Sequence, residues 1–186
     1  MPILPPVVKQ ISSDNFGLVI AYLLPGFVTL WGIRPFSTSV DAWFGSSGTT
    51  APTVGEFFYV TLASTATGLI VSTIRWALID QLYHRTGIPE PAWDFGKLPA
   101  ALAAFDSHIQ DHYRYYQFHA NMLVAIAFSY GAQLIAHHRW PGQDGWKIDV
   151  AVACLLLVLV LGSRDTLRKY YRRTAAILPA RRRRQG

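Results

Sequence analysis

Four long apolar stretches, the last of which runs directly into an arginine-rich tail, constrain what this chain can fold into. Each stretch carries charged residues only near its ends. An α-helix needs roughly 20 apolar residues to cross the hydrocarbon core of a bilayer, and about 17 is the lower limit. We therefore expect four membrane-spanning helices, at about residues 16–33, 57–76, 119–137 and 147–163.

The composition favours an all-α integral membrane four-helix protein over a soluble helical domain. Hydrophobic residues make up 51% of the 186 residues, and the mean hydropathy is +0.22. Helices of a soluble domain of this size carry a charged face toward water, which these stretches lack. We expect a single transmembrane domain covering residues 1–186, without a separate soluble module. The single cysteine, Cys154, excludes a disulfide framework within one chain.

The basic residues are distributed unevenly, and this predicts the orientation. The tail at residues 164–186 holds nine basic residues and one acid, a net charge of +8 in a chain whose total is +6. Basic segments flanking membrane spans remain in the cytoplasm. Four spans then place both termini there, together with the connection at residues 80–118. Fourteen basic residues lie inside and three lie outside in this arrangement.

Two of the predicted helices continue beyond the bilayer. No proline or glycine occurs from Ala100 to Gly131, and none follows Gly162 until Pro179. We therefore expect two helices extended into the cytoplasm. Residues 83–99 contain three prolines and two glycines and cannot form a regular helix. The Gly/Ser/Thr-rich connection at residues 34–56 is expected to be irregular.

Small and polar residues inside the second and third spans favour either helix packing or a water-lined path. Ser64, Gly68 and Ser72 repeat every four residues, a spacing that lets helix backbones approach closely. Polar groups in lipid face protein or a cavity. The pore or packing candidates are Thr61, Ser64, Thr65, Gly68, Ser72, Asn121, Ser129 and Gln133. Arg75, at the end of the second span, is an interfacial anchor, an ion-pair partner of Asp80 or a gating charge.

The tail is the strongest functional signal in the chain. Arg164, Arg168 and Arg172 recur every four residues and share one helix face. Such a face binds anionic lipid headgroups, and it also suits a nucleotide or a short single-stranded nucleic acid, whose bases stack on tyrosines. The predicted ligand-binding residues are Arg164, Arg168, Lys169, Tyr170, Arg172 and Arg173, whereas Arg181 to Arg184 act as a topology determinant.

No catalytic or metal motif stands out, so we expect no enzyme, cofactor or metal. His108 and His112 have metal-ligand spacing, but the motif HIQDH differs from the HExxH motif of zinc proteases. Arg114 and His119 fit an R-x4-H pattern that resembles the ribonuclease motif of HEPN domains, although His119 begins a membrane span. A lipid-modifying enzyme using the residues from Asp106 to His112 is the third-ranked hypothesis.

The layout of spans and tail resembles the small membrane effectors of bacterial antiphage systems, such as the Hailong-type effector channels. This resemblance is architectural and includes no shared motif. It implies a homo-oligomeric ion channel in the bacterial inner membrane, opened by a nucleotide signal that a cytosolic partner enzyme makes. The residues by themselves leave open an alternative, a non-catalytic accessory or assembly subunit of a larger membrane complex.

Overall fold

The structure is a computed structural model, and it describes residues 17, 19–45, 53–89, 91, 93, 98–142 and 145–178. Within residues 98–111 it describes the backbone and the side chain of Leu102. In the described part of the chain the structure is helical and contains no strand. This result confirms the all-α fold.

Among the described residues, four helical segments are long and apolar enough to cross a membrane: Val19–Phe36, Val54–Arg85, His112–Ala136 and Trp146–Ile177. They overlap the four predicted spans. The first segment contains η1 (Val19–Leu23), α2 (Leu24–Ile33) and η2 (Arg34–Phe36). The second contains α4 (Val54–Arg75), η3 (Trp76–Asp80) and α5 (Gln81–Arg85). The third belongs to α6 (Leu98–Ala136), and the fourth is α7 (Trp146–Ile177).

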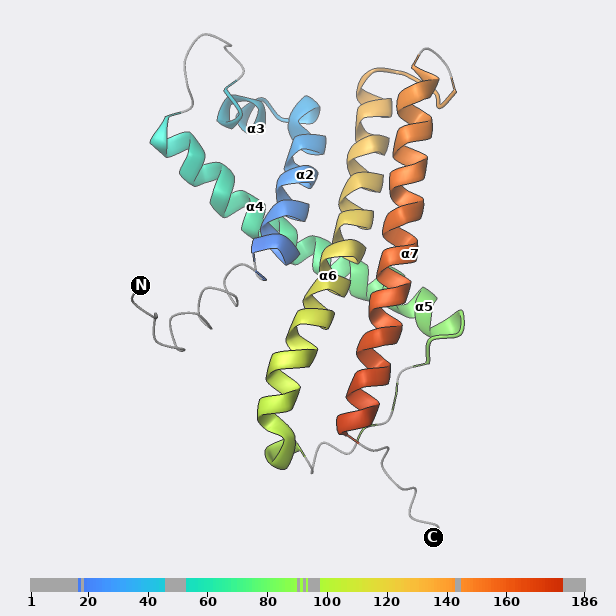
Figure 1. Ribbon diagram of the computed structural model, residues 1–186. Coiled ribbons are helices and arrows are strands. Elements are labelled where there is room, and N and C mark those ends of the chain that lie inside the picture. The colour runs from blue at the N-terminus through green and yellow to red at the C-terminus, as the bar shows by residue number, and fades with distance from the viewer. Residues whose placement is uncertain are drawn as a thin grey trace, which may run out of the picture.

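The long helix α6 is the centre of the bundle (Figure 1). It forms an antiparallel hairpin with α7 on one side and contacts α2 on the other, while α4 crosses the bundle obliquely. The hairpin turns through Gly142 and Gly145, whose φ angles of 84° and 95° favour glycine. The amino-terminal ends of α4 and α7 and the carboxyl-terminal ends of α2 and α6 lie at one end of the molecule.

The predicted irregular connection at residues 34–56 is wrong in its first half. After η2, the short helix α3 (Thr38–Trp43) forms there, and the Ser37 side chain caps its first turn by accepting from the Val40 amide. The helix α4 begins with a reciprocal cap, in which Thr53 Oγ1 accepts from the Glu56 amide at 3.2 Å and Glu56 Oε2 accepts from the Thr53 amide at 2.6 Å.

The predicted helical extensions are present. The helix α6 begins at Leu98, two residues before the expected Ala100, because the first turn of a helix tolerates Pro99. The helix α7 continues without interruption through the basic segment to Ile177. Both helices therefore extend well past their apolar segments, as the spacing of helix breakers predicts.

Close backbone contact joins α4 to the first helical segment. A Cβ atom added at Gly26 would overlap the carbonyl oxygen of Ser64, and one added at Gly68 would overlap the carbonyl oxygen of Tyr22. Glycine is therefore needed at both positions. Ser64 and Gly68 are buried in this contact, so they pack helices within one chain.

Candidate functional site

Arg75 and Asp80 form an ion pair inside the bundle, and Tyr116 of α6 joins them. Arg75 Nη1 lies 2.9 Å from Oδ1 and 3.0 Å from Oδ2 of Asp80. Tyr116 donates its hydroxyl to Asp80 Oδ1, and its ring centre lies 5.2 Å from the Arg75 guanidinium carbon. Arg75 is 3% exposed and Tyr116 is fully buried. Of the three sequence interpretations of Arg75, the structure supports the ion pair.

A widened helical turn allows residues five apart to pair. The segment η3, from Trp76 to Asp80, is π-helical, and i to i+5 hydrogen bonding aligns residues five positions apart. In a regular α-helix the side chains of Arg75 and Asp80 would point about 140° away from each other, given 3.6 residues per turn. The irregular turn is therefore the local feature that creates the buried pair.

The polar residues of α6 that follow Tyr116 bind the first helical segment. Gln117 Nε2 donates to the Tyr22 hydroxyl at 3.1 Å. Asn121 Nδ2 donates to the carbonyl of Ala21 at 2.7 Å, and Asn121 is fully buried. These bonds place Asn121 in helix packing within one chain.

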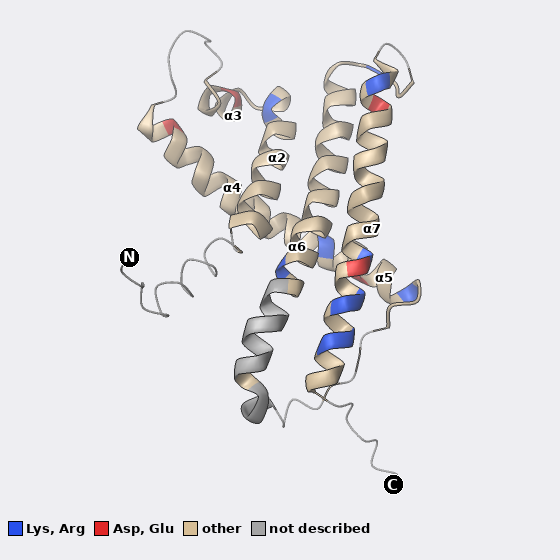
Figure 2. Cartoon of the chain, in the orientation of Figure 1, with Lys and Arg blue, Asp and Glu red and all other residues tan. Residues whose placement is uncertain are grey.

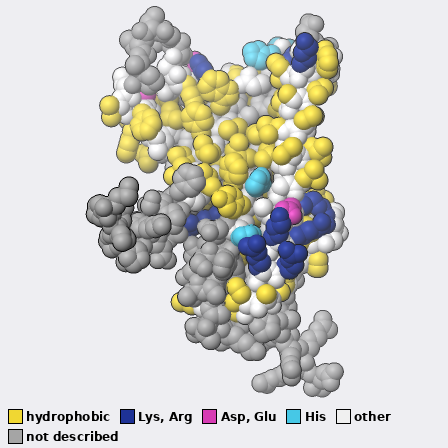
Figure 3. Space-filling view, viewed as in Figure 1, with side chains coloured by type: hydrophobic (Ala, Val, Ile, Leu, Met, Phe, Trp, Pro, Cys, Tyr) yellow, Lys and Arg dark blue, Asp and Glu magenta, His cyan; other side chains and the backbone are white. Residues whose placement is uncertain are grey.

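Exposed cations gather on the carboxyl-terminal half of α7 (Figures 2 and 3). Arg168, Lys169, Arg172 and Arg173 are all exposed, and we call these four residues the basic surface. Lys169 Nζ lies 2.5 Å from Asp165 Oδ2, one turn earlier in the helix. The basic surface thus presents positive charge to solvent along more than one turn, which suits a polyanionic ligand.

Arg164 binds the end of α5 instead of joining the basic surface. Its Nη1 donates to Thr86 Oγ1 at 2.9 Å, and its Nη2 donates to the Thr86 carbonyl at 2.8 Å. The guanidinium carbon also lies 5.1 Å from the ring centre of Tyr83. Next to it, the Tyr83 hydroxyl and Ser163 Oγ are 2.6 Å apart. These four residues, which we call the latch, fasten α7 to the end of α5.

Tyr170, which follows Arg164 by six residues in α7, packs into an aromatic cluster. Its ring centre lies 5.1 Å from that of Tyr113 and 5.8 Å from that of Trp93. The neighbouring Tyr171 lies 5.7 Å from Trp93, and its hydroxyl is 3.0 Å from His84 Nε2. Tyr170 is half-buried. Stacking on a nucleic-acid base would require its ring to leave Tyr113 and Trp93.

Three hydroxyl-bearing residues of α4 that are not buried lie in one stripe. Thr61, Thr65 and Ser72 follow each other at spacings of four and seven residues, and we call them the hydroxyl stripe. Thr65 is exposed and the other two are partly exposed. The hydroxyls of Thr61 and Thr65 donate to the carbonyls of the residues four positions earlier, at 2.8 and 2.9 Å. This back-bonding makes them compatible with a lipid or partner environment.

The third span uses its polar residues differently. Ser129 Oγ donates to the carbonyl of Val28 at 2.6 Å, so both Ser129 and Asn121 hold α6 against the first helical segment. Gln133 lines a groove between α2, α6 and α7. Two of the three predicted polar residues of this span are thus engaged within one chain, and the hydroxyl stripe of α4 is the better candidate for a water-lined path.

Tyr83, Thr86, Tyr116 and Ser163 are site residues that the sequence did not indicate. Their partners lie 36, 78 or 80 positions away along the chain. No spacing pattern reports such contacts. The one available signal is the unusual density of tyrosine around residues 113–116 and 170–171.

The described residues contain no group of three or more His, Cys, Asp or Glu side chains that could hold a metal ion. The side chains of Asp106 and His108 lie outside the described residues, so the structure does not place the face considered for lipid chemistry. Arg181 to Arg184 also lie outside them. Cys154 is exposed on α7.

The fold defines a class, that of all-helical chains with four candidate membrane-spanning helices, as in multi-pass membrane proteins. No protein-family model matches the chain, and neither the curated proteins nor the solved structures include a match. The functional argument therefore depends on the geometry of the latch, the basic surface and the hydroxyl stripe.

Proposed function

We propose that this protein is a homo-oligomeric ion channel of the bacterial cytoplasmic membrane, gated by an anionic cytoplasmic ligand. A nucleotide or a short single-stranded oligonucleotide, made by a cytosolic partner enzyme, binds the basic surface. The observation that carries this proposal is the latch, because it connects the helix with the basic surface to the segment continuous with α4.

The charge distribution supports the orientation of the proposal. At the end of the molecule where α3 lies, Arg34 pairs with Asp41, Arg139 pairs with Asp149, and Lys147 stands in the first turn of α7. Figure 2 shows both signs of charge at this end. The basic surface and Arg85 lie toward the other end. Because cytoplasmic flanks carry an excess of Lys and Arg, this second end faces the cytoplasm and both termini lie on that side.

Exposed apolar side chains support insertion and oligomerisation. Large apolar residues cover the outer faces of α4 and α7, and Phe57, Leu62, Leu157 and Val158 are each more than half exposed (Figure 3). A water-soluble monomer rarely exposes such continuous apolar surface. Lipid covers part of it, and further copies of the chain cover the α4 face around an axis lined by the hydroxyl stripe.

The latch gives a physical route from ligand to pore. An anion on the basic surface attracts Arg164, which lies one turn before Arg168 on the same face of α7. Arg164 then exchanges Thr86 for the ligand, and the α4–α5 segment loses one of its attachments to α7. The ligand shifts the channel toward the open state only if it binds that state more tightly.

Planar-bilayer recording tests this function. Purified protein is measured with and without an eight-nucleotide oligonucleotide, beside the double variant Arg168→Gln/Arg172→Gln. Lys147→Gln is the matched control, since it removes an exposed cation from the opposite end of the same helix. We expect ligand-dependent conductance in the wild type and the control only.

Three outcomes would contradict the proposal. Conductance that responds fully to the ligand in the double variant would exclude the basic surface as the sensor. Absence of any conductance in a pure homo-oligomer would exclude the channel. Purification as a stoichiometric complex with another protein would instead support the alternative, a non-catalytic accessory subunit.

A further inference from the structure

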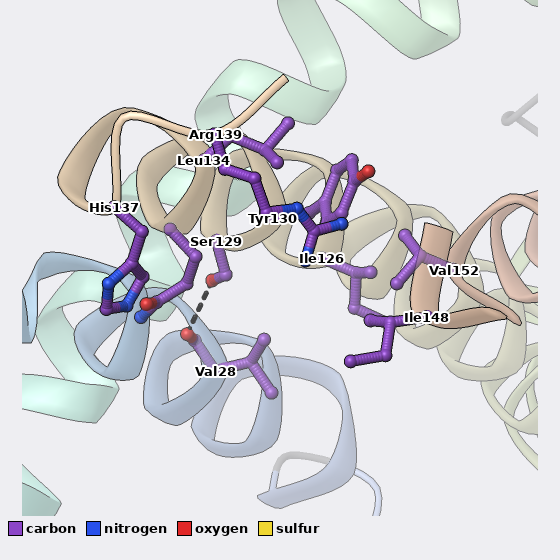
Figure 4. A pocket seen from close by; sticks show the side chains of 10 residues that line it. Val28, Ile126, Ser129, Tyr130, Leu134, His137, Arg139, Ile148 and Val152 are labelled. Carbon is purple, nitrogen blue, oxygen red and sulfur yellow. Dashed lines mark hydrogen bonds between the residues drawn. The ribbon is translucent and has the colours of Figure 1, made fainter. Parts of the chain in front are cut away.

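A groove of about 380 Å³ opens between α2 and α7, with α6 as its floor (Figure 4). Val28 of α2 forms one wall, and Ile148 and Val152 of α7 form the other. Ile126 and Leu134 belong to the floor. The volume lies within the range of small-molecule sites, about 300–1,000 Å³. The groove exists because α2 and α7 contact different sides of α6.

One end of the groove is polar. Gln133, His137 and Arg139 line it near the carboxyl-terminal end of α6, and Figure 4 shows the Arg139 guanidinium beside the ring of Tyr130. Arg139 Nη2 is ion-paired with Asp149, which also accepts a hydrogen bond from the Tyr130 hydroxyl at 2.8 Å. The Nε atom of Arg139 is buried and has no hydrogen-bond partner among the described residues.

The groove has the dimensions and polarity of a site for an amphiphile. Along the helix axis, the floor extends about 17 Å from Ile126 to His137, at 1.5 Å per residue. That length matches roughly half of the 30 Å hydrocarbon core of a bilayer. The apolar end thus points toward the bilayer centre, and the polar end lies at the depth of headgroups.

We propose that this groove binds one acyl chain of a phospholipid, whose phosphate or ester oxygens lie at the polar end formed by Gln133, His137 and Arg139. The inference rests on the membrane insertion contained in the proposed function. An acyl chain covers the apolar walls, and the headgroup oxygens meet the polar side chains at the other end. The bound lipid acts as a spacer between α2 and α7.

Charge complementarity favours a lipid over a second copy of the chain. A partner helix would need an acidic side chain opposite the polar end formed by Gln133, His137 and Arg139. The described acids at this end are all engaged: Asp41 pairs with Arg34, Glu56 caps α4 and Asp149 pairs with Arg139. A phospholipid carries its own anionic oxygen.

Photolabelling tests the site. The full-length protein is reconstituted in vesicles of phosphatidylglycerol that contain a tracer with a photoactivatable group in one acyl chain, and labelled peptides are mapped by mass spectrometry. We expect labels to concentrate on Ile126, Ile148 and Val152. We expect Val152→Trp to fill the groove and lower this labelling about tenfold, the change that a loss of about 1.4 kcal/mol in binding free energy produces.

Leu157→Trp is the matched control, because Leu157 is 59% exposed on α7 and does not line the groove. It should leave groove labelling unchanged. A tracer alkane with the same photoactivatable group, which has no acceptor oxygen, should label the groove less than the phospholipid does. Circular dichroism and size-exclusion chromatography confirm that both variants are folded. If Val152→Trp is not folded, Ile148→Phe takes its place in the same comparison.

Two results would overturn the proposal. One is labelling spread evenly over the exposed face of α7, or labelling that Val152→Trp does not change. The other is efficient disulfide cross-linking between copies through Val152→Cys in a Cys154→Ala background, which would place a second copy in the groove. Carbonate extraction of the same vesicles separates the hypotheses: an inserted but unlabelled protein rejects the groove alone, whereas an extracted protein rejects the proposed function too.

Discussion

Arg75 and Asp80 are paired across a single π-helical turn, with Arg75 Nη1 within 3.0 Å of both carboxylate oxygens. Tyr116 donates to the same carboxylate from the central helix α6. Through Tyr116 the pair therefore also links the oblique α4–α5 segment to α6. Removing one partner of a buried ion pair leaves an uncompensated charge, so a single substitution of either partner is strongly destabilising.

The first prediction concerns this pair. We expect Arg75→Gln to lower the free energy of unfolding by about 3 kcal/mol, the lower end of the range for broken buried pairs, because Asp80 retains some exposure. Unfolding is followed by circular dichroism in mixed micelles with increasing denaturing detergent. Arg85→Gln, an exposed cation on the same segment, is the control and should change little. Recovery of stability in Arg75→Met/Asp80→Leu would support the assignment, and equal losses for Arg75→Gln and Arg85→Gln would contradict it.

The second prediction concerns the glycine contact. We expect Gly68→Ala to separate α4 from the first helical segment and lower the free energy of unfolding by about 1–3 kcal/mol, as overpacking does. Its Cβ would meet the backbone of Tyr22, which cannot rotate away. Gly131→Ala is the matched control because, apart from the backbone of its own helix turn, nothing lies within 4 Å of the added Cβ, and alanine favours the helix. The same measurement should show Gly131→Ala to be neutral or stabilising, and a tolerated Gly68→Ala would mean that the two helices do not meet there.

The third prediction concerns the latch. We expect Thr86→Val to remove the side-chain acceptor of Arg164 while leaving the basic surface intact. The variant should bind oligonucleotide more tightly than the wild type and open at lower ligand concentration, because the closed state loses one of the two hydrogen bonds that Arg164 donates to Thr86. Binding by fluorescence anisotropy and conductance in bilayers measure the two properties. Thr73→Val is the control, since the Thr73 hydroxyl donates only within α4. Wild-type gating in Thr86→Val would remove the latch from the mechanism.

Much of the fold could be predicted from sequence because it depends on local properties. Runs of apolar residues placed the four long helices, and the spacing of proline and glycine located the extensions of α6 and α7. The helix α3 was missed because its six residues are too few to show a periodicity, although Ser37 is a typical N-cap. The π-helical turn at η3 also escaped prediction, since no residue type marks such a turn.

The candidate site was predictable only where it is exposed. Arg168 and Arg172 lie on an open helix face, as their spacing predicts. Arg164 has the same spacing, yet it binds Thr86, 78 positions away, because the end of α5 happens to lie beside that turn of α7. Tyr170 is likewise held by Tyr113, which sits on another helix. Contacts of this kind depend on helix packing, which one sequence does not show.

The fourth prediction is the salt dependence of ligand binding, which reports how many cations contact the ligand. Each neutralised phosphate of a single strand contributes about −0.7 to the slope of log K against log salt. If all four residues of the basic surface bind phosphates, the slope is about −3 per chain. Fluorescence anisotropy of a labelled eight-nucleotide strand between low and high salt measures it.

Single variants then measure how much each residue contributes to the slope. We expect Arg168→Gln and Arg172→Gln each to reduce the slope by about 0.7, because both side chains are exposed. Lys169→Gln should reduce it less, since Lys169 is already paired with Asp165. Tyr170→Leu, which removes the aromatic ring, should leave both slope and affinity unchanged because that ring packs on Tyr113 and Trp93 and not on a base. A slope near zero, or equal effects of Lys169→Gln and Arg168→Gln, would show that the ligand does not bind the basic surface as arranged in this structure.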